Sequence, residues 1–221
     1  MADSAFPAMT FSALGYESAH HGNGRWNGVA ILSRVGLDDP VAGFFGEKED
    51  EITETRLLSA TCGGVRVSSV YVPNGRSLDD PHYDFKLKWL DELRQLLEKS
   101  TPQDKVAVCG DFNIAPTDID VWDSDRFQGA THVSKPERDA LQRLEAWGLV
   151  DVFRELYPQD KLYSYWDYRA GDFHNHRGMR IDLLLMTKPL ADKATWAVVD
   201  RQARKGTLPS DHAPVLVDIT E

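Results

Sequence analysis

The sequence has few cysteines and no long apolar run. Only two of its 221 residues are cysteines, Cys62 and Cys109, which lie far apart and in or beside apolar stretches. We therefore expect buried free thiols rather than a disulfide or a metal site, which fits a reducing, cytoplasmic setting. No apolar run approaches the roughly 20 residues of a membrane-spanning helix, and the N-terminus lacks the basic start and apolar stretch of a secretion signal. We expect a soluble, cytoplasmic monomer with no membrane partner.

Positive charge is also scarce. The chain carries 25 Lys and Arg against 35 Asp and Glu, a net charge of −10, whereas phosphate backbones are bound mainly by Lys and Arg. Net charge does not report local charge, however, and basic residues gather in two late stretches, 168–180 and 200–212. For any one of these arginines, Arg169 and Arg180 included, the first expectation is a solvated loop surface. The histidines of "FHNHRG" (173–178) suggest a metal site, but further ligands are missing nearby, which favours a polar loop.

The chain has no internal repeat and no linker rich in Gly, Ser or Pro, which argues against solenoids and propellers and favours one domain spanning residues 1–221. Short apolar runs predict strands, and longer runs with a 3.6-residue period predict helices. The expected strands are 28–32, 56–60, 65–72, 105–109, 181–186, 195–199 and 213–219, and the expected helices are 81–99 and 135–147. Ser134 and Glu137 have the capping-box spacing at the second helix. Several strands follow one another directly, so we expect an α/β sandwich of mixed or antiparallel sheets covered by helices.

The stretch "CGDFNIAPTDID" (109–120) ends a predicted strand with two polar side chains. Asp111 and Asn113 follow Gly110 with only Phe112 between them. Gly, Asp and Asn are common wherever a strand stops and a turn begins. Taken alone, the motif therefore fits a turn and a functional site equally well.

A similar arrangement occurs in "VYVPNGR" (70–76). Tyr71 ends a predicted strand, and Asn74 and Arg76 follow in a Pro-Asn-Gly sequence. A β-favouring aromatic and an ordinary turn would explain this segment as well.

Asp182 is harder to explain structurally, because it lies inside the apolar run "IDLLLM". A buried carboxylate costs several kcal/mol unless it is paired or hydrogen-bonded. His212, which follows Asp211 at the mouth of the last strand, is the obvious partner, since a carboxylate that orients an imidazole is a recurring catalytic device. A neutral core histidine remains an alternative.

Together these motifs place carboxylates, an amide and an imidazole near strand ends. Carboxylate oxygens are the ligands that Mg²⁺ and Mn²⁺ prefer, and such a metal polarises a phosphoryl oxygen while a carboxylate or imidazole activates water. The combination predicts metal-assisted phosphoester hydrolysis. The residues concerned are Asp111, Asn113, Asp182, Asp211 and His212.

At this point the sequence resembles a known family. The segments "GDFNIAPTDID", "WGLVDVFRELYP", "YSYWDYRAGDFHNHRGMRIDLLL" and "PSDHAPV", in this order, are similar to the exonuclease III family of repair nucleases and apurinic/apyrimidinic endonucleases, within the endonuclease/exonuclease/phosphatase superfamily. The resemblance runs from about Phe6 to the last strand. It implies a four-layer αββα sandwich and a Mg²⁺- or Mn²⁺-dependent DNA-repair nuclease acting on double-stranded DNA, at 3′ ends and abasic sites.

The resemblance also implies roles for individual residues. Asp111 matches the residue that orients or deprotonates the attacking water, and Tyr71 the tyrosine that lies against the scissile phosphate. Asn113 matches the residue that helps to hold the phosphate. Asp182 matches the carboxylate that pairs with the family histidine, here His212.

The implied metal ligands are Asp111, Asn113 and Asp211. Tyr165 and Trp166 fall where the family has aromatic residues lining the pocket for an extruded abasic sugar. We expect Asn74, Arg76, Tyr165, Trp166 and Arg169 to contact DNA.

One departure from the family pattern is large. Members normally open with a strand, a helix and a second strand that ends in a Gln-Glu pair, whose glutamate is a principal metal ligand. This sequence begins after that point, so we expect a domain that lacks one strand-helix-strand unit of roughly 30 residues or more, with weak activity in consequence.

Two other functions stay open. A catalytically impaired DNA-binding or interaction module would keep the fold and its surface. A phosphatase acting on lipid or small phosphate esters would share the superfamily motifs, although "YSYWDYR" argues against it.

Overall fold

The computed structural model describes residues 1–24, 26–44 and 54–220. The largest sheet in these ranges has six strands in the order β3-β4-β5-β6-β8-β7. β5 and β6 are parallel and all other neighbours are antiparallel, so the sheet is mixed. Its strands are β3 (Asp38–Ala42), β4 (Leu57–Cys62), β5 (Val65–Tyr71), β6 (Val106–Asp111), β7 (Leu149–Asp151) and β8 (Asp182–Thr187).

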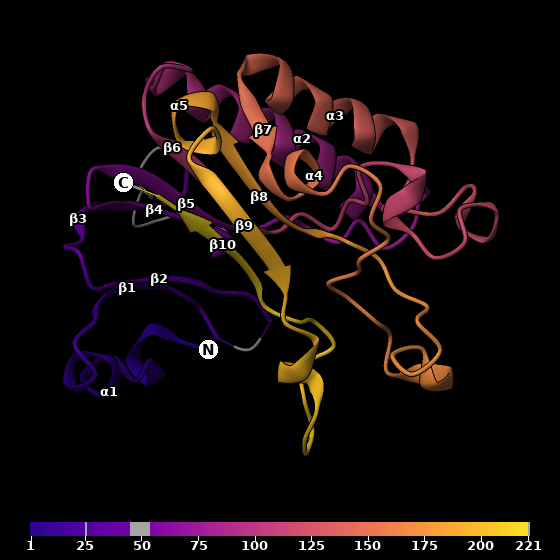
Figure 1. Ribbon diagram of the computed structural model, residues 1–221, viewed down its shortest axis with the longest axis horizontal. Coiled ribbons are helices and arrows are strands. Elements are labelled where there is room, and N and C mark those ends of the chain that lie inside the picture. Colours follow the sequence, from indigo (N-terminus) through magenta and orange to yellow (C-terminus); the bar gives the residue numbers. More distant parts are fainter. Residues whose placement is uncertain (25, 45–53, 221) are drawn as a thin grey trace.

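Helices cover one face of this sheet and two strand pairs cover the other (Figure 1). The helical face carries α2 (Pro81–Leu96) and α3 (Lys135–Trp147). The opposite face carries the pairs β1 (Glu17–His21) with β2 (Val29–Ser33), and β9 (Ala194–Val199) with β10 (Val215–Ile219). The short helices are α1 (Ala8–Ala13), which packs on β1, and α4 (Val152–Leu156) and α5 (Lys188–Ala191).

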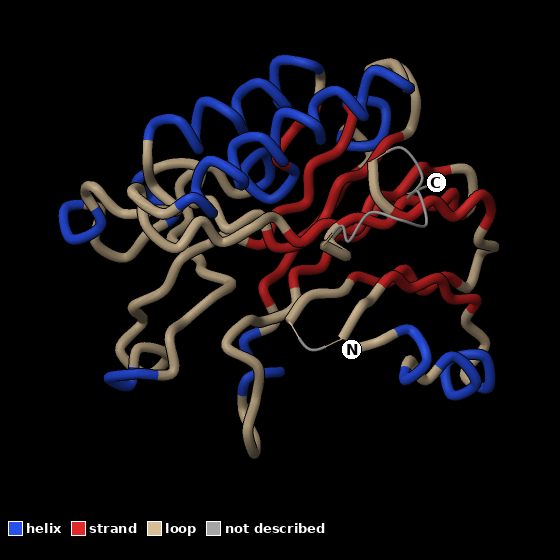
Figure 2. Tube along the Cα trace, turned by 180° about the vertical axis from the view of Figure 1, so that it is seen from behind, coloured by secondary structure: helices blue, strands red, loops and turns tan. Residues whose placement is uncertain are grey.

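Figure 2 shows the same order of layers from behind: the helices α2 and α3, the six-stranded sheet, the two strand pairs and then α1. The expected α/β fold with a mixed sheet is confirmed. In the described ranges the second β layer consists of two separate two-stranded ladders rather than one continuous sheet.

Successive side chains of a strand point to opposite faces of the sheet, and both faces are covered here. The central strands are therefore buried on both sides. Val106 and Val108 of β6 pack with the residues of α2 and α3, whereas Ala107 between them packs toward β10. Leu183 and Leu185 of β8 likewise belong to the cluster under the helices. These continuous apolar runs explain why the strands were predictable from the sequence.

Turn and cap chemistry agree with the sequence at two points. Gly63 and Gly64 both have positive φ and close the tight turn between β4 and β5. Ser134 and Glu137 form the expected capping box at α3. The strands 17–21, 38–42 and 149–151 were not predicted, because such short segments show no clear apolar alternation.

Two expectations from composition can be compared with the structure. Cys62 and Cys109 are free, although both are only partly buried, and desolvation raises the pKa of the Cys109 thiol to about 11. Among the described helices, none has the length and apolar character needed to cross a membrane.

Candidate active site

The strand register places three polar side chains side by side at one end of the central sheet. Asp111, the last residue of β6, pairs with Tyr71 at the end of β5 and with Asp182 at the start of β8. Residues in register on neighbouring strands share a face of the sheet. Backbone pairing alone therefore fixes a phenol and two carboxylates next to one another.

Gly110 allows β5 and β6 to approach closely just before this end. Its φ is +144°, and a Cβ built on it would lie 1.9 Å from the carbonyl oxygen of Val70. No side chain fits in that space, so the residue before Asp111 must be glycine.

His212 is the partner that the Asp182 carboxylate requires. Its Nδ1 lies 2.8 Å from Asp182 Oδ2. Burial acts to lower the pKa of His212, but the hydrogen bond and the charge of Asp182 outweigh it and raise the pKa to about 9. The imidazole is therefore cationic at neutral pH, as expected for a carboxylate-oriented histidine.

Asn113 fixes the Asp111 carboxylate. Its backbone N–H donates to Oδ1 at 2.8 Å, and its Nδ2 donates to Oδ2 at 3.0 Å. Burial and the neighbouring Asp182 carboxylate raise the pKa of Asp111 to about 7. Asp111 can therefore gain or lose a proton near neutral pH.

The Asn113 side chain makes several contacts inside the protein. Besides Asp111, its Nδ2 donates to Val72 O at 2.9 Å, and its Oδ1 accepts from Asn74 Nδ2 at 3.1 Å and lies 3.0 Å from His132 Nε2. Asn113 is also only 4% exposed. Both hydrogens of Nδ2 are used inside the protein, so this amide has no donor left for a phosphate oxygen.

A buried polar network behind Asn113 was not predicted from the sequence. Lys86 is fully buried and donates to Asn113 O at 2.6 Å and to Glu137 Oε1 at 2.5 Å. Desolvation, reinforced by the charge of Lys86, lowers the pKa of His132 to about 4, so this imidazole is neutral. Thr131 also donates to Glu137 Oε1. The network holds the turn after β6 in place.

The sequence held one signal for this network. Lys86 is in phase with Trp89, Leu90 and Leu93, which form the buried face of α2. A lysine in that phase requires a buried acidic partner. Nothing local to Lys86 identifies Glu137 as that partner, because 51 residues separate them.

A buried ion cluster positions the start of β8. Arg180 is 1% exposed, and its Nε lies 2.6 Å from Asp120 Oδ1 while its Nη2 lies 2.7 Å from Asp151 Oδ2. Arg154 also donates to Asp120 Oδ1, at 2.5 Å. The expectation of a solvated Arg180 was wrong, because a desolvated guanidinium here finds two carboxylates.

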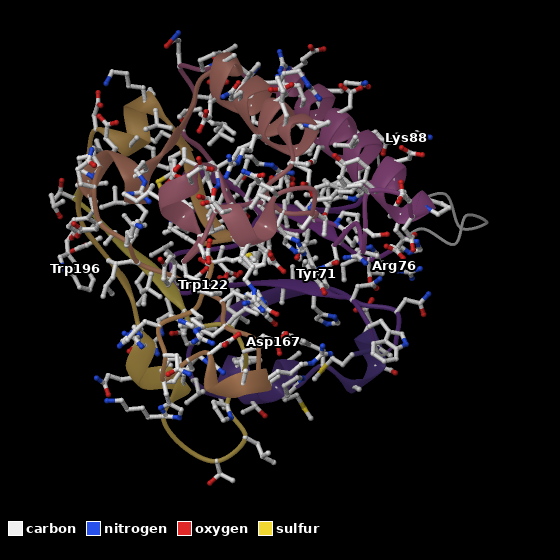
Figure 3. All side chains as sticks on the ribbon, turned by 90° about the vertical axis from the view of Figure 1, so that its right-hand side faces the viewer. Tyr71, Arg76, Lys88, Trp122, Asp167 and Trp196 are labelled. Carbon is white, nitrogen blue, oxygen red and sulfur yellow. The ribbon has the colours of Figure 1, made fainter. Side chains whose placement is uncertain are left out.

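The site includes a cavity of about 620 Å³, lined among others by Tyr71, Asp111 and His212. Figure 3 shows Tyr71, Trp122 and Asp167, three of its lining residues, on the side of the molecule that faces the viewer. The cavity is also lined by residues that were not predicted from the sequence: Trp122, Arg126, His132 and Met179. The predicted site residues that line it are Tyr71, Asn74, Asp111, Asn113, Tyr165, Arg169, Asp211 and His212.

Two predicted DNA contacts lie outside the cavity wall. The side chain of Arg76 is 61% exposed, 3.7 Å from Asp80, and Figure 3 places it away from Asp167. Trp166 is 1% exposed and packs edge-on against Phe173 in a core cluster. The expectation that Trp166 lines the pocket was wrong, because adjacent side chains in an extended segment point to opposite sides and Tyr165 takes the cavity side.

The donor set of the cavity suits a divalent cation that substrate and water help to hold. In residues 1–24, 26–44 and 54–220, no group of three or more His, Cys, Asp or Glu side chains is arranged to bind a metal by itself. Asp111 and Asp211 nevertheless line the same cavity, and Mg²⁺ is usually bound by one or two carboxylates together with waters and substrate phosphates. The Asp111 and Asp182 carboxylates are paired on neighbouring strands, and a bound cation would reduce the repulsion between them.

Known proteins resemble the chain over nearly its whole length. The endonuclease/exonuclease/phosphatase family model matches residues 2–212. Exodeoxyribonuclease III of Haemophilus influenzae is 34% identical, covering 97% of this chain and 85% of that protein. An AP endonuclease structure from Archaeoglobus fulgidus has a TM-score of 0.93 at 33% identity, covering 99% of this chain and 85% of the other. A 3′ phosphatase from Neisseria, bound to a product DNA hairpin, has a TM-score of 0.95 at 33% identity, covering 100% and 86%.

Proposed function

Since this chain belongs to the endonuclease/exonuclease/phosphatase family, we propose that its cavity hydrolyses phosphodiester bonds of double-stranded DNA at 3′ ends and at abasic sites. Its relatives include an exodeoxyribonuclease III and an AP endonuclease, and the chain is a DNA-repair nuclease. The observation that supports the finer proposal best is the set formed by Tyr71, Asp111, Asp182 and His212. Strand register and a 2.8 Å hydrogen bond assemble this set at the edge of an open cavity.

In the proposed reaction Asp111 accepts the proton of the attacking water. In the metal-free site the pKa of Asp111 is about 7, and a bound cation would favour its ionised form, which is the form that accepts a proton. His212, held cationic by Asp182, stabilises the negative charge that develops on the phosphoryl oxygens. Asn113 acts by orienting Asp111 through its two hydrogen bonds.

Tyr71 and the outer wall position the substrate. The Tyr71 ring is held by the Arg56 guanidinium, whose Cζ lies 4.6 Å from the ring centroid, so the phenol is fixed beside Asp111. Arg169 lies at the rim with a side chain that is 90% exposed, which suits contact with a phosphate. Tyr165 supplies an apolar wall for a sugar or base.

The family is metal-dependent, and we propose Mg²⁺, with Mn²⁺ as a substitute. Asp111 and Asp211 would hold the ion together with substrate phosphate. When bound, it supplies polarisation of the phosphoryl oxygen and neutralises charge on the substrate. The monomeric state and the cytoplasmic location remain predictions from the sequence.

Substrate class is tested with three substrates, each incubated in Mg²⁺ and in EDTA. They are a duplex with one abasic site, an intact duplex labelled at its 3′ ends, and a small phosphate monoester. We expect EDTA-sensitive cleavage of both duplexes and little action on the ester. Hydrolysis of the ester alone would indicate that the protein is a phosphatase. Binding of duplex without cleavage in Mg²⁺ and in Mn²⁺ would indicate a DNA-binding module without catalytic activity.

A further inference from the structure

A second pocket, of about 370 Å³, lies between the two late basic loops. In Figure 1 these loops project from the body of the molecule, one in orange and one in yellow. The pocket shares no lining residue with the catalytic cavity. Its lining residues are Phe173, His174 and His176 from the first loop and Arg201, Gln202 and Lys205 from the second.

The pocket has the opposite charge character to the rest of the chain. The molecule carries a net charge of −10, and the catalytic cavity is lined by four aspartates together with three arginines. Among the described residues no carboxylate lines the second pocket, and Arg201 and Lys205 give it two fixed positive charges. His174 and His176 add imidazole groups that can donate hydrogen bonds. This composition suits an anion.

The guanidinium of Arg201 is held in place, and no carboxylate among the described residues forms an ion pair with it. Its Nη2 donates to Phe173 O at 3.4 Å, and its Cζ lies 5.0 Å from the Phe173 ring and 5.3 Å from the Trp166 ring. Its Nε is buried and has no hydrogen-bond partner among the described residues. Rigid arginines of this kind are preferred for binding phosphate.

We propose that this pocket binds a backbone phosphate of the DNA strand outside the cleavage site. The inference rests on the proposed nuclease function. Residues 167, 169 and 172 of the first loop line the catalytic cavity, and residues 173, 174 and 176 of the same loop line the second pocket. We therefore infer that a duplex bound at the catalytic cavity also lies close enough to contact the second pocket.

The test measures duplex affinity over a range of salt concentrations, in EDTA, for the wild type and for Arg201→Gln/Lys205→Gln. The slope of log affinity against log salt should become shallower by about 0.9 for each phosphate that the variant no longer binds. Single-turnover cleavage at saturating DNA in Mg²⁺ should stay unchanged, because no cavity residue is altered. Lys205→Gln alone should show part of the effect, and Arg201→Lys should largely preserve the slope. Lys88→Gln is the matched control, since Figure 3 shows Lys88 on α2, away from Asp167.

An unchanged slope in the double variant, with normal wild-type binding and cleavage, would overturn the inference and leave the nuclease function intact. Calorimetric binding of inorganic phosphate that the double variant loses, with an unchanged DNA slope, would make the pocket a small-anion site and also overturn it. Absence of DNA binding and cleavage by the wild type would instead refute the proposed function.

Discussion

Replacing Gly110 by alanine should destabilise the protein far more than the same change at Gly206. The two glycines have nearly identical φ values, +144° and +145°, so the backbone strain of an alanine is matched at about 1–3 kcal/mol. At Gly206 the new Cβ meets nothing within 4 Å, whereas at Gly110 it lies 1.9 Å from Val70 O. The difference between the variants therefore isolates the close approach of β5 and β6.

The strands must separate by about 1 Å to admit the new methyl group, since real Cβ contacts are at least 3.0 Å. Bonds such as Val72 N to Asp111 O, now 2.9 Å, would then stretch beyond hydrogen-bond range. Loss of about two such bonds at ~1 kcal/mol each, with ~1–3 kcal/mol of packing strain, gives Gly110→Ala a deficit of at least about 3 kcal/mol relative to Gly206→Ala.

Urea unfolding of the wild type and both variants measures this difference. Cleavage by Gly110→Ala should fall as well, because Tyr71 and Asp111 face each other across the same two strands. Equal stability of the two alanine variants would refute the reasoning about strand approach.

Four further changes test other parts of the site. His212→Asn should lower turnover at least ~10²-fold with little change in duplex binding, because the charge-stabilising imidazolium is lost; parallel loss of binding would contradict this. In EDTA, the stability of Asp111→Asn relative to the wild type should increase as pH rises from 4 toward 7, because a pKa of Asp111 raised to about 7 means that ionisation of this buried carboxyl destabilises the wild-type folded state. Urea unfolding at several pH values measures this difference, and a difference that does not change with pH would contradict it. Lys86→Met should cost ~3–5 kcal/mol, because Glu137 keeps a buried charge without its partner, and Lys86→Met/Glu137→Gln should recover part of it in the same assay. For Arg169→Gln, the slope of log duplex affinity against log salt concentration should become shallower by about 0.9. An unchanged slope would show that Arg169 does not contact a phosphate.

The long apolar elements and the catalytic motifs could be predicted because each carries its own local signal. Asp182 within an apolar strand required a partner, and the structure supplies His212 at 2.8 Å. The helices 81–99 and 135–147 follow from their periods, with boundaries changed only where α2 gives way to a 3₁₀ turn at Leu97.

The features that were missed depend on contacts between distant residues. The pairing of Lys86 with Glu137 and of Arg180 with Asp120 and Asp151 joins segments that no local pattern connects. From the sequence, charged side chains at such positions are expected to be solvated. They are buried ion pairs here because the fold packs the distant segments together. Trp166 was misplaced for a related reason, since the sequence shows an aromatic pair but not which member faces the cavity.

The central claim is that Asp111, in register with Tyr71 and Asp182, activates water in a metal-dependent cleavage of DNA. The most direct test is single-turnover cleavage of a labelled duplex with one abasic site by the wild type, Asp111→Asn and the control Asp91→Asn, which changes an exposed carboxylate on α2. We expect EDTA-sensitive cleavage by the wild type and by Asp91→Asn, and a rate at least ~10²-fold lower for Asp111→Asn. Equal cleavage by all three proteins, or cleavage that EDTA leaves unchanged, would contradict the claim.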